Sequence, residues 1–177
     1  MPTFANITHE ADRSGLQFLV IGGHAVAHHN YPRTTEDTDI LVSSDDREAW
    51  LELADRLGLK VFHDGGTFLQ LTPDDSAAWR LDLMLVNAVT FAKMIAAAES
   101  GKLEGQTVLV ASLEHLLALK FHALKHARGI RVLKDMDDVV NLVTNNRVDV
   151  KAPAFRELVL KYGTAELYEK LSGLCSE

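Results

Sequence analysis

Short apolar runs and polar breaks divide the first part of this chain into expected strands and helices. The stretch QFLVIGG predicts a buried strand ending in glycine, and HAVAHHNY predicts a helix directly behind it. Further strands are expected at DTDILV, in both halves of KVFHDGGTFLQLT and at WRLDLMLV. Between them, DDREAWLELADRLG has the period of an amphipathic helix, with Ser44 or Asp45 as its cap and Gly58 as its end.

Helical periodicity dominates from TFAKMIAAAESG onward, with one interruption at KLEGQTVLVAS that predicts a small hairpin. Helices are expected over residues 113–128, 131–145, 152–162 and 164–172. Because the pattern changes near residue 110, we expect an α/β (α+β) fold with two parts. Residues 1–110 would form a mixed β-sheet core flanked by helices, and residues 111–177 a C-terminal helical segment packed on that core.

Composition narrows the class of protein without identifying it. With 177 residues, 47% apolar and 24% charged, the chain is long and apolar enough for a folded core. Its single cysteine, Cys175, excludes an internal disulfide and a cysteine-based metal site. The N-terminal residues lack a signal-peptide pattern, and no apolar run reaches the roughly 18 residues of a membrane span. We therefore expect a cytoplasmic protein without a membrane partner.

Three acidic residues are the candidates for chemistry. Asp37 and Asp39 are two residues apart in one expected strand, so they share a face, and Asp82 lies in a later apolar strand where an ionised carboxylate is costly. Magnesium is usually held by carboxylates together with substrate phosphates, so a metal site is one interpretation. The other is structural, with Asp37 capping a turn, Asp39 exposed and Asp82 paired with Arg80 or another base.

A glycine pair precedes these acids and has two interpretations as well. Gly22 and Gly23 stand between a strand and a helix, where a bare backbone can approach phosphate oxygens closely. A glycine turn after a strand is also commonly a structural feature of the fold. Only the position of the pair in the order of motifs along the chain favours phosphate binding over a structural turn.

That order resembles a known family. It comprises Gly22-Gly23, then Arg33-x-Thr35-x-Asp37-x-Asp39, a strand carrying Asp82, and the stretches LLALKFHAL and RVLKDMDDVVNL. The set is similar to the minimal nucleotidyltransferases of the polymerase-beta-like superfamily, and within it to the AbiEii-type group that includes toxins of bacterial toxin–antitoxin pairs. The resemblance covers roughly residues 16–145. Many relatives have Gly-Ser in place of Gly-Gly, and longer toxins have a larger helical domain.

The resemblance implies transfer of a nucleoside monophosphate from an NTP to an acceptor, with two Mg²⁺ ions. By position, Gly22, Gly23, Arg33 and Thr35 would bind the nucleotide, and Asp37, Asp39 and Asp82 would hold the metals, Asp82 also serving as base. Lys120 and Asp135 match positions that face the nucleotide in similar toxins. The acceptor would be tRNA or another RNA, or a small hydroxyl compound, and a cognate antitoxin would be a partner.

Basic residues could serve such a reaction, although the net charge of −7 argues against nucleic-acid binding over the whole surface. Arg33 and Lys120 are the candidate phosphate ligands. Residues 115–134 contain no acid and five cations, which could surround an RNA or nucleotide acceptor or could simply be the solvated face of amphipathic helices: Lys120, Lys125, Arg128, Arg131 and Lys134.

Histidines add a weaker signal. His24 and His28 have the i, i+4 spacing of a helical metal pair, yet the glutamate of a metalloprotease motif is missing between them. Two hypotheses for function follow. One is an Mg²⁺-dependent nucleotidyltransferase, and the other is a non-catalytic nucleotide-binding or protein-interaction module with the same fold. The presence of all three acids favours the enzyme, because a binding module gains nothing from a costly acidic cluster.

Overall fold

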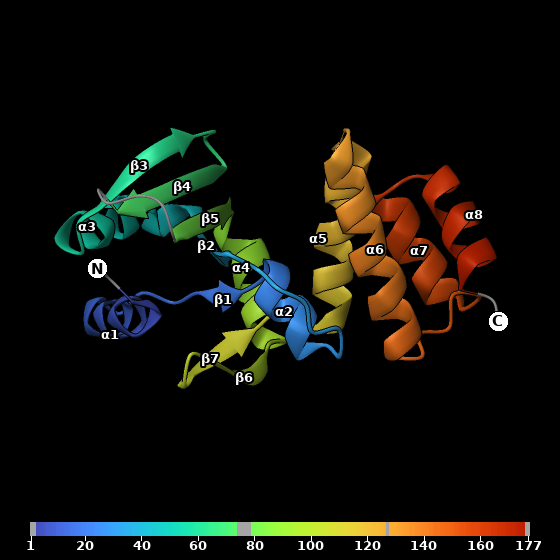
Figure 1. Cartoon of the computed structure of the whole chain (residues 1–177), viewed down its shortest axis with the longest axis horizontal. Helices are drawn as coiled ribbons and strands as arrows, with labels where there is room; N and C mark the ends of the chain where they lie inside the picture. The colour runs from blue at the N-terminus through green and yellow to red at the C-terminus, as the bar shows by residue number, and fades with distance from the viewer. Residues whose placement is uncertain (1–2, 74–78, 127, 176–177) are drawn as a thin grey trace. The chain divides into compact units, whose positions relative to one another are not determined.

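The computed structural model of the chain describes residues 3–73, 79–126 and 128–175, and the chain divides into two compact units (Figure 1). The first unit, Met1–Ala25 with Arg33–Ser112, contains the sheet, and the second, Val26–Pro32 with Leu113–Glu177, is helical. The division into domains 1–110 and 111–177 stays a prediction. The two units differ from it chiefly in that Val26–Pro32 groups with the later helices. Over the described ranges, no helix combines the length and apolar character needed to cross a bilayer.

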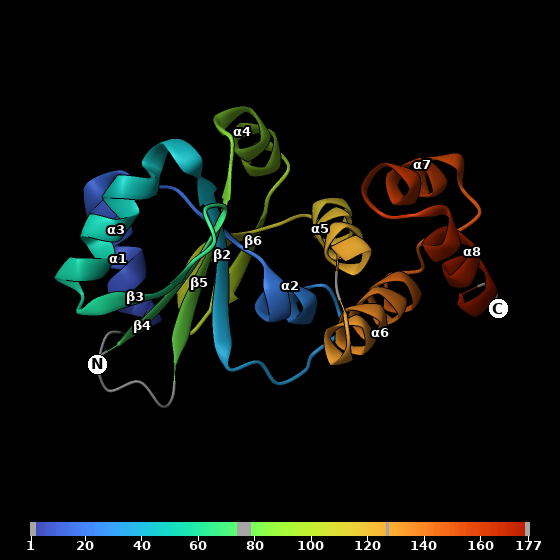
Figure 2. The ribbon, with the colours of Figure 1, turned by 90° about the horizontal axis from the view of Figure 1, so that it is seen from above.

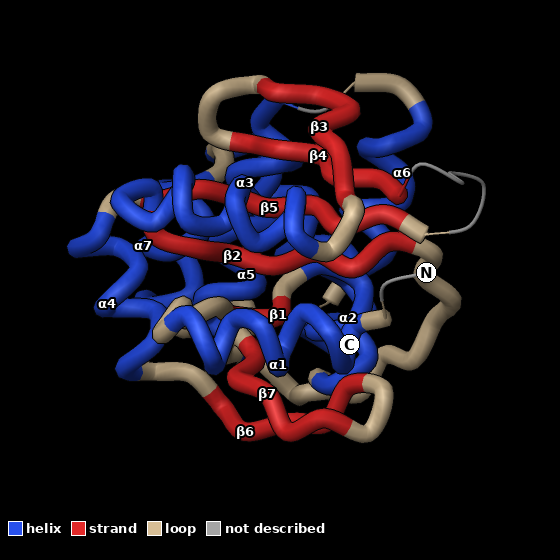
Figure 3. Tube along the Cα trace, turned by 90° about the vertical axis from the view of Figure 1, so that its left-hand side faces the viewer, coloured by secondary structure: helices blue, strands red, loops and turns tan. Residues whose placement is uncertain are grey.

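A seven-stranded mixed sheet forms the first unit over the described ranges, and its strands are red in Figure 3. In chain order the strands are β1 (Leu19–Val20), β2 (Asp37–Ser43), β3 (Leu59–Asp64), β4 (Phe68–Pro73), β5 (Arg80–Val86), β6 (Glu99–Leu103) and β7 (Gln106–Val110). Their spatial order is β3-β4-β5-β2-β1-β7-β6, with the pairs β2–β5 and β1–β7 parallel and the others antiparallel. The predicted fold class is therefore confirmed.

The parallel pair β2–β5 lies inside the sheet and is its most apolar part. Parallel strands covered on both faces have nearly continuous apolar sequences, and ILV of β2 and the leucines of β5 follow this rule. These side chains are almost fully buried: Ile40, Leu41, Val42, Leu81, Leu83 and Leu85. The charged residues at the start of both strands are therefore exceptions to the apolar pattern: Asp37 and Asp39 on β2, and Arg80 and Asp82 on β5. By contrast, the edge strand β3 exposes Phe62 to 70%.

Helices of the first unit are α1 (Phe4–Ser14), the 3-10 turn η1 (Ser44–Asp46), α3 (Arg47–Arg56) and α4 (Ala88–Ala96). α1 and α3 lie beside each other (Figure 2), and Phe18 packs edge-to-face against Phe4 of α1 at 6.1 Å and Trp50 of α3 at 6.0 Å. The sequence analysis did not predict α1. Its cap is a Thr3–Asn6 box, a variant of the usual pattern with Glu or Gln. Ser43 caps η1, and Asp46 stands at the N-cap of α3 without a side-chain hydrogen bond, so the expected cap of this helix at Ser44 or Asp45 is wrong.

Four helices follow the sheet: α5 (Leu113–His126), α6 (Ile130–Asn145), α7 (Pro153–Tyr162) and α8 (Ala165–Leu174). They match the four predicted helices to within a few residues, although α5 ends at His126 and the predicted end at residue 128 is not helical, while Ala127 lies outside the described ranges. Phe121 and Phe155 pack edge-to-face at 5.9 Å and join α5 to α7.

The helix α2 (Gly22–His28) begins in the first unit, and the residues after it are anchored in the second. Asn146, just after α6, donates to the backbone oxygen of His29 at 2.8 Å, and Tyr31 donates to the carboxylate of Asp137 at 2.6 Å. These contacts give a physical reason for grouping Val26–Pro32 with the helices.

Candidate active site

Polar side chains form a row across the middle of the sheet. Asp39 on β2 is the register partner of Asp82 on the parallel strand β5, and Asp82 is the partner of Gln70 on the antiparallel strand β4. Neighbouring strands lie about 4.8 Å apart, and register partners point to the same face. Beside the row, the amide of Ile21, which directly follows β1, donates to the backbone oxygen of Asp39 at 3.0 Å. Two of the three candidate carboxylates therefore stand side by side.

Asp82 is the most buried member of the row, with 7% of the residue exposed. Its Oδ2 accepts a 3.3 Å hydrogen bond from the Gln70 amide, whereas its buried Oδ1 has no hydrogen-bond partner within the described ranges. Burial raises the pKa of Asp82 to about 6; the Gln70 bond and Arg80 oppose the rise, and the charges of Asp39 and Asp37 add to it. A buried carboxylate oxygen without a donor is costly, which marks this atom as one that a ligand would satisfy.

Asp37 lies two residues before Asp39 on the same face of β2, and its partner is an arginine. Arg80, its register partner on β5, donates from Nε to Oδ1 at 3.0 Å and from Nη2 to Oδ2 at 3.5 Å. The structural alternative in the sequence analysis paired Arg80 with Asp82; that pairing is wrong, because the parallel register places Arg80 opposite Asp37. The capping alternative for Asp37 is also wrong, since Asp37 begins a strand.

The glycine pair packs against the same cluster. Gly22 has a left-handed φ of +59°, and a β-carbon there would collide with the carboxylate of Asp39. At Gly23 a β-carbon would come within 2.7 Å of the Thr35 hydroxyl and 3.2 Å of Arg33 Nη1. Both positions therefore require glycine for reasons within the protein itself. The pair also brings Arg33 and Thr35 next to the acidic row.

His24 directly follows the glycine pair in α2, and the sequence analysis considered it only as part of a helical metal pair with His28. Burial lowers the pKa of His24, Asp39 and Glu104 oppose that change, and Arg33 adds to it. Arg33 itself donates from Nη1 to the backbone oxygen of Thr34 at 3.2 Å.

Lys120 and Asp135, the remaining predicted nucleotide ligands, lie in the helical unit. Lys120 Nζ on α5 donates to Asp135 Oδ1 at 2.7 Å and to Asp138 Oδ2 at 2.6 Å, both on α6. All three residues are buried, with exposures of 9%, 5% and 0%. In the structure this lysine joins two helices, and its role toward a nucleotide stays a prediction.

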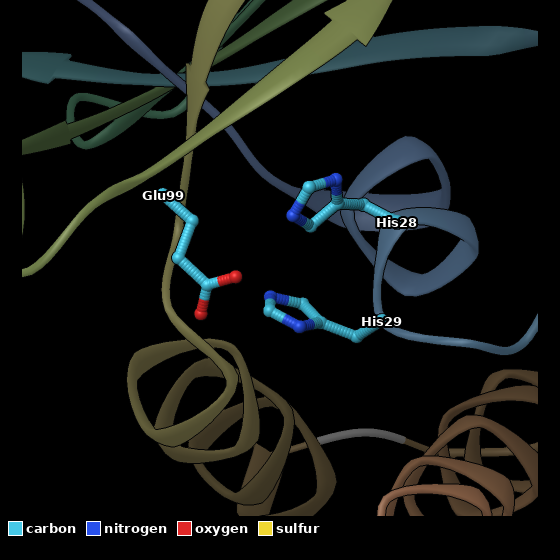
Figure 4. Close-up of side chains that lie close together, drawn as sticks. All are labelled: His28, His29 and Glu99. Atoms are coloured by element: carbon cyan, nitrogen blue, oxygen red, sulfur yellow. The ribbon is translucent and has the colours of Figure 1, made fainter.

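The neighbouring histidines contact each other directly. His28, at the end of α2, and the buried His29 place their rings edge-to-face at 5.0 Å (Figure 4). The spacing of His24 and His28 suggested a helical metal pair, whereas in the structure the ring of His28 contacts that of His29.

The structure thus gathers seven of the nine predicted site residues in the first unit: Gly22, Gly23, Arg33, Thr35, Asp37, Asp39 and Asp82. Sequence reasoning missed Gln70, the roles of Arg80 and His24, and Asp138. Gln70 carried one signal, because it is a polar residue in the alternating strand FLQLTP. The pairing that places it beside Asp82 depends on register, which sequence periodicity does not determine.

The donor set suits a hard divalent cation. Asp37, Asp39 and Asp82 offer carboxylate oxygens on one sheet face, and none of the described residues donates to Asp82 Oδ1. Magnesium and manganese prefer oxygen ligands of this kind. These residues therefore fit the metal that the family resemblance implies.

Comparison with known proteins agrees with this fold. No protein-family model matches the sequence, and no curated protein is similar to it in sequence. Among solved structures, ANT(2'')-Ia in complex with adenylyl-2''-tobramycin is similar with a TM-score of 0.68 and 18% identity, covering 90% of this chain and 94% of that one. The lincomycin-bound lincosamide antibiotic adenylyltransferase LnuA has a TM-score of 0.57 and 15% identity, over 80% and 95% of the two chains.

A nucleotidyltransferase-like protein from Paracoccidioides brasiliensis is also similar, with a TM-score of 0.57 and 14% identity over 96% of this chain and 88% of that one. At these identities the likeness concerns the fold. The chain has the fold of solved nucleotidyltransferases.

Proposed function

We propose that this protein is an Mg²⁺-dependent nucleotidyltransferase that transfers a nucleoside monophosphate from an NTP to an acceptor hydroxyl. The observation that carries the proposal is the pairing of Asp39 with Asp82 in register, with Asp82 Oδ1 buried and lacking a donor among the residues that the structure describes. A fold shared with nucleotidyltransferases does not guarantee activity, so the argument rests on these side chains.

Asp37, Asp39 and Asp82 would hold two Mg²⁺ ions in this proposal. Bound there, magnesium would neutralise charge on the phosphates and stabilise the attacking and leaving oxygens of an in-line displacement. Such a role explains why three acids gather at one end of the apolar pair β2–β5. Without a bound cation, their mutual repulsion and the burial of Asp82 are unfavourable.

The nucleotide would lie against the glycine turn. Gly22 and Gly23 present backbone without side chains, and Arg33 and Thr35 lie directly beside Gly23. An arginine fork can bind phosphate oxygens at two points, so Arg33 would orient the triphosphate. Lys120 and Asp135 enter this proposal only through the family resemblance.

In the proposed reaction the acceptor hydroxyl oxygen attacks the α-phosphorus of the NTP. A new oxygen–phosphorus bond forms, the bond from the α-phosphorus to the bridging oxygen breaks, and pyrophosphate leaves. Asp82 accepts the hydroxyl proton, because an ionised carboxylate within reach of the acceptor can serve as a general base. Gln70 holds Oδ2 of Asp82, which leaves Oδ1 as the atom directed to the ligand.

Two acceptor classes have support of different kinds. The similar structures ANT(2'')-Ia and LnuA are described with adenylyl-2''-tobramycin and lincomycin, which favours a small hydroxyl compound. The AbiEii-type resemblance favours tRNA or another RNA, with the protein acting as the toxin of a toxin–antitoxin pair. One observation supports RNA, namely the cations exposed around the end of α5 and the start of α6: Lys125, Arg128, Arg131 and Lys134.

A labelling assay tests the proposal. The protein is incubated with each α-labelled NTP and Mg²⁺, once with a panel of polyhydroxyl small molecules and once with total RNA. Label transferred to either acceptor, and lost in Asp39→Asn but retained in Asp45→Asn, supports the proposal and identifies the acceptor class. Asp45 is an exposed acid in η1, away from the row, and so is a matched control. Metal-dependent NTP binding without transfer would favour the non-catalytic module.

A further inference from the structure

Arg80 stands inside the acidic cluster and is not among the residues that the proposed chemistry uses. It lies two residues before Asp82 on β5 and therefore on the same face of the sheet. Its guanidinium meets the Asp37 carboxylate through two nitrogens, at 3.0 Å and 3.5 Å. The two side chains are partly exposed, at 43% for Arg80 and 34% for Asp37.

This pairing places a permanent positive charge where the proposed function places divalent cations. An arginine guanidinium carries a fixed positive charge, and its planar fork fixes the orientation of the carboxylate that it holds. A cation that shares Asp37 must therefore compete with Arg80 for the oxygens and bind against its charge. Arg80 therefore holds the Asp37 carboxylate in one orientation and at the same time lowers the affinity of the nucleotide-free protein for a divalent cation.

We propose that Arg80 is a positioning residue that makes metal binding depend on the nucleotide. The inference rests on the proposed function and deepens it. Arg80 holds Asp37 in place and weakens divalent-cation binding to the protein alone, so the site fills well only when the triphosphate brings its own negative charge. Magnesium sites built from carboxylates and substrate phosphates commonly need both partners.

A structural role for Arg80 would have a different signature. If the Arg80–Asp37 pair only supported the β2–β5 contact, its loss would lower stability to the same extent with and without metal. A partly exposed pair is expected to contribute little to stability, which makes the two roles separable.

Isothermal titration with Mn²⁺, with and without a non-hydrolysable ATP analogue, tests the inference. For Arg80→Gln we expect Mn²⁺ to bind about 10-fold more tightly to the nucleotide-free protein, because a nearby positive charge is removed. The nucleotide should then increase Mn²⁺ affinity by a smaller factor than in the wild type. Arg80→Lys keeps the charge without the fork, so its Mn²⁺ affinity should stay close to that of the wild type.

Arg47→Gln is the matched control, because Arg47 pairs with Asp64 at 2.5 Å in the same unit with similar exposure. It should leave Mn²⁺ affinity unchanged. Thermal unfolding in EDTA accompanies each titration and shows whether each variant is folded.

The outcomes separate the two proposals. In one outcome the wild-type protein binds Mn²⁺, and folded Arg80→Gln binds it with the same affinity and the same nucleotide effect. That result would overturn the role of Arg80 and leave the transferase proposal standing. Wild-type protein that binds no Mn²⁺, even with the nucleotide analogue, overturns the proposed function and the role of Arg80 with it.

Discussion

Each of the two units contains a cluster of carboxylates around one cation. The sheet cluster consists of Asp37, Asp39 and Asp82 with Arg80, and the helical cluster of Asp135 and Asp138 with Lys120. The clusters differ in how the negative charge of the carboxylates is compensated. In the helical cluster, Lys120 reaches both Asp135 and Asp138 with hydrogen bonds of 2.7 Å and 2.6 Å. In the sheet cluster, Arg80 reaches Asp37, while Asp82 accepts a hydrogen bond from the Gln70 amide and has a pKa raised to about 6.

This difference separates a structural cluster from one suited to a ligand. The lysine of the helical cluster joins α5 to α6. One oxygen, Asp135 Oδ2, has no hydrogen bond to any described residue, and it lies 3.8 Å from Arg131 Nε. In the sheet cluster the oxygen that no described residue donates to, Asp82 Oδ1, stands on a strand next to another acid. A cation is therefore the natural complement of the sheet cluster, whereas the helical cluster already contains its own.

The largest effect is expected from Asp39→Asn in the sheet cluster. Loss of a metal-binding carboxylate should lower the rate of nucleotide transfer by about 10³-fold. The free energy of unfolding should be unchanged or slightly higher, because one of three repelling charges is removed. The labelling assay and a urea denaturation curve measure the two quantities. A clear fall in the free energy of unfolding together with the loss of transfer would indicate that Asp39 has a structural role instead.

In the helical cluster, Lys120→Met should act on stability. Removing the lysine leaves two buried carboxylates without their cation, which we expect to lower the free energy of unfolding by about 3 to 5 kcal/mol. Urea denaturation measures this change, with Lys125→Met as an exposed control that should have little effect.

The same variant, Lys120→Met, tests whether the helical cluster is only structural. A stable Lys120→Met protein that has lost NTP binding would show that Lys120 is a nucleotide ligand, as the family resemblance implies. The helical cluster would then belong to the reaction and would not be only structural.

The raised pKa of Asp82 predicts a dependence of stability on pH. The folded state holds this proton up to about pH 6, whereas the unfolded chain releases it near 4. In EDTA the free energy of unfolding should therefore fall as pH rises from about 4 to 6, by about 2 to 3 kcal/mol from this group. Denaturation curves of wild type and Asp82→Asn across this range isolate the contribution. An identical slope in both proteins would contradict it.

A smaller loss is expected from Gly22→Ala. The left-handed φ of +59° strains an alanine, and its β-carbon would displace the carboxylate of Asp39, so the free energy of unfolding should fall by about 2 kcal/mol. Gly58→Ala is matched, because Gly58 has a φ of +72° with open space around it. The difference between the two variants measures the contact with Asp39, and equal losses would show that the contact is unimportant.

Much of the fold could be predicted from the sequence, because its elements have strong local signals. The apolar runs of β2 and β5 and the breaks at Gly129 and Gly163 mark elements directly. The helix α1 was missed, since its capping box uses Asn6 and its apolar face is short. The grouping of Val26–Pro32 with the helices depends on side-chain contacts such as Asn146 to His29, which no local pattern contains.

For the site, the residue types could be predicted but not their partners. Periodicity placed Asp37 and Asp39 on one face, and burial in an apolar strand singled out Asp82. Which strand lies beside which, and in what register, decides that Arg80 meets Asp37 and that Gln70 meets Asp82. Because register is set by the whole sheet, these contacts appear only in the structure.

A crystal structure grown with Mn²⁺ and a non-hydrolysable NTP analogue tests the central claim most directly, through the anomalous signal of the metal. The account predicts an anomalous peak about 2.1 Å from carboxylate oxygens of Asp39 and Asp82, with phosphate oxygens completing the coordination. Bound nucleotide without a peak at these carboxylates, and with the Gln70–Asp82 hydrogen bond unchanged, would contradict it.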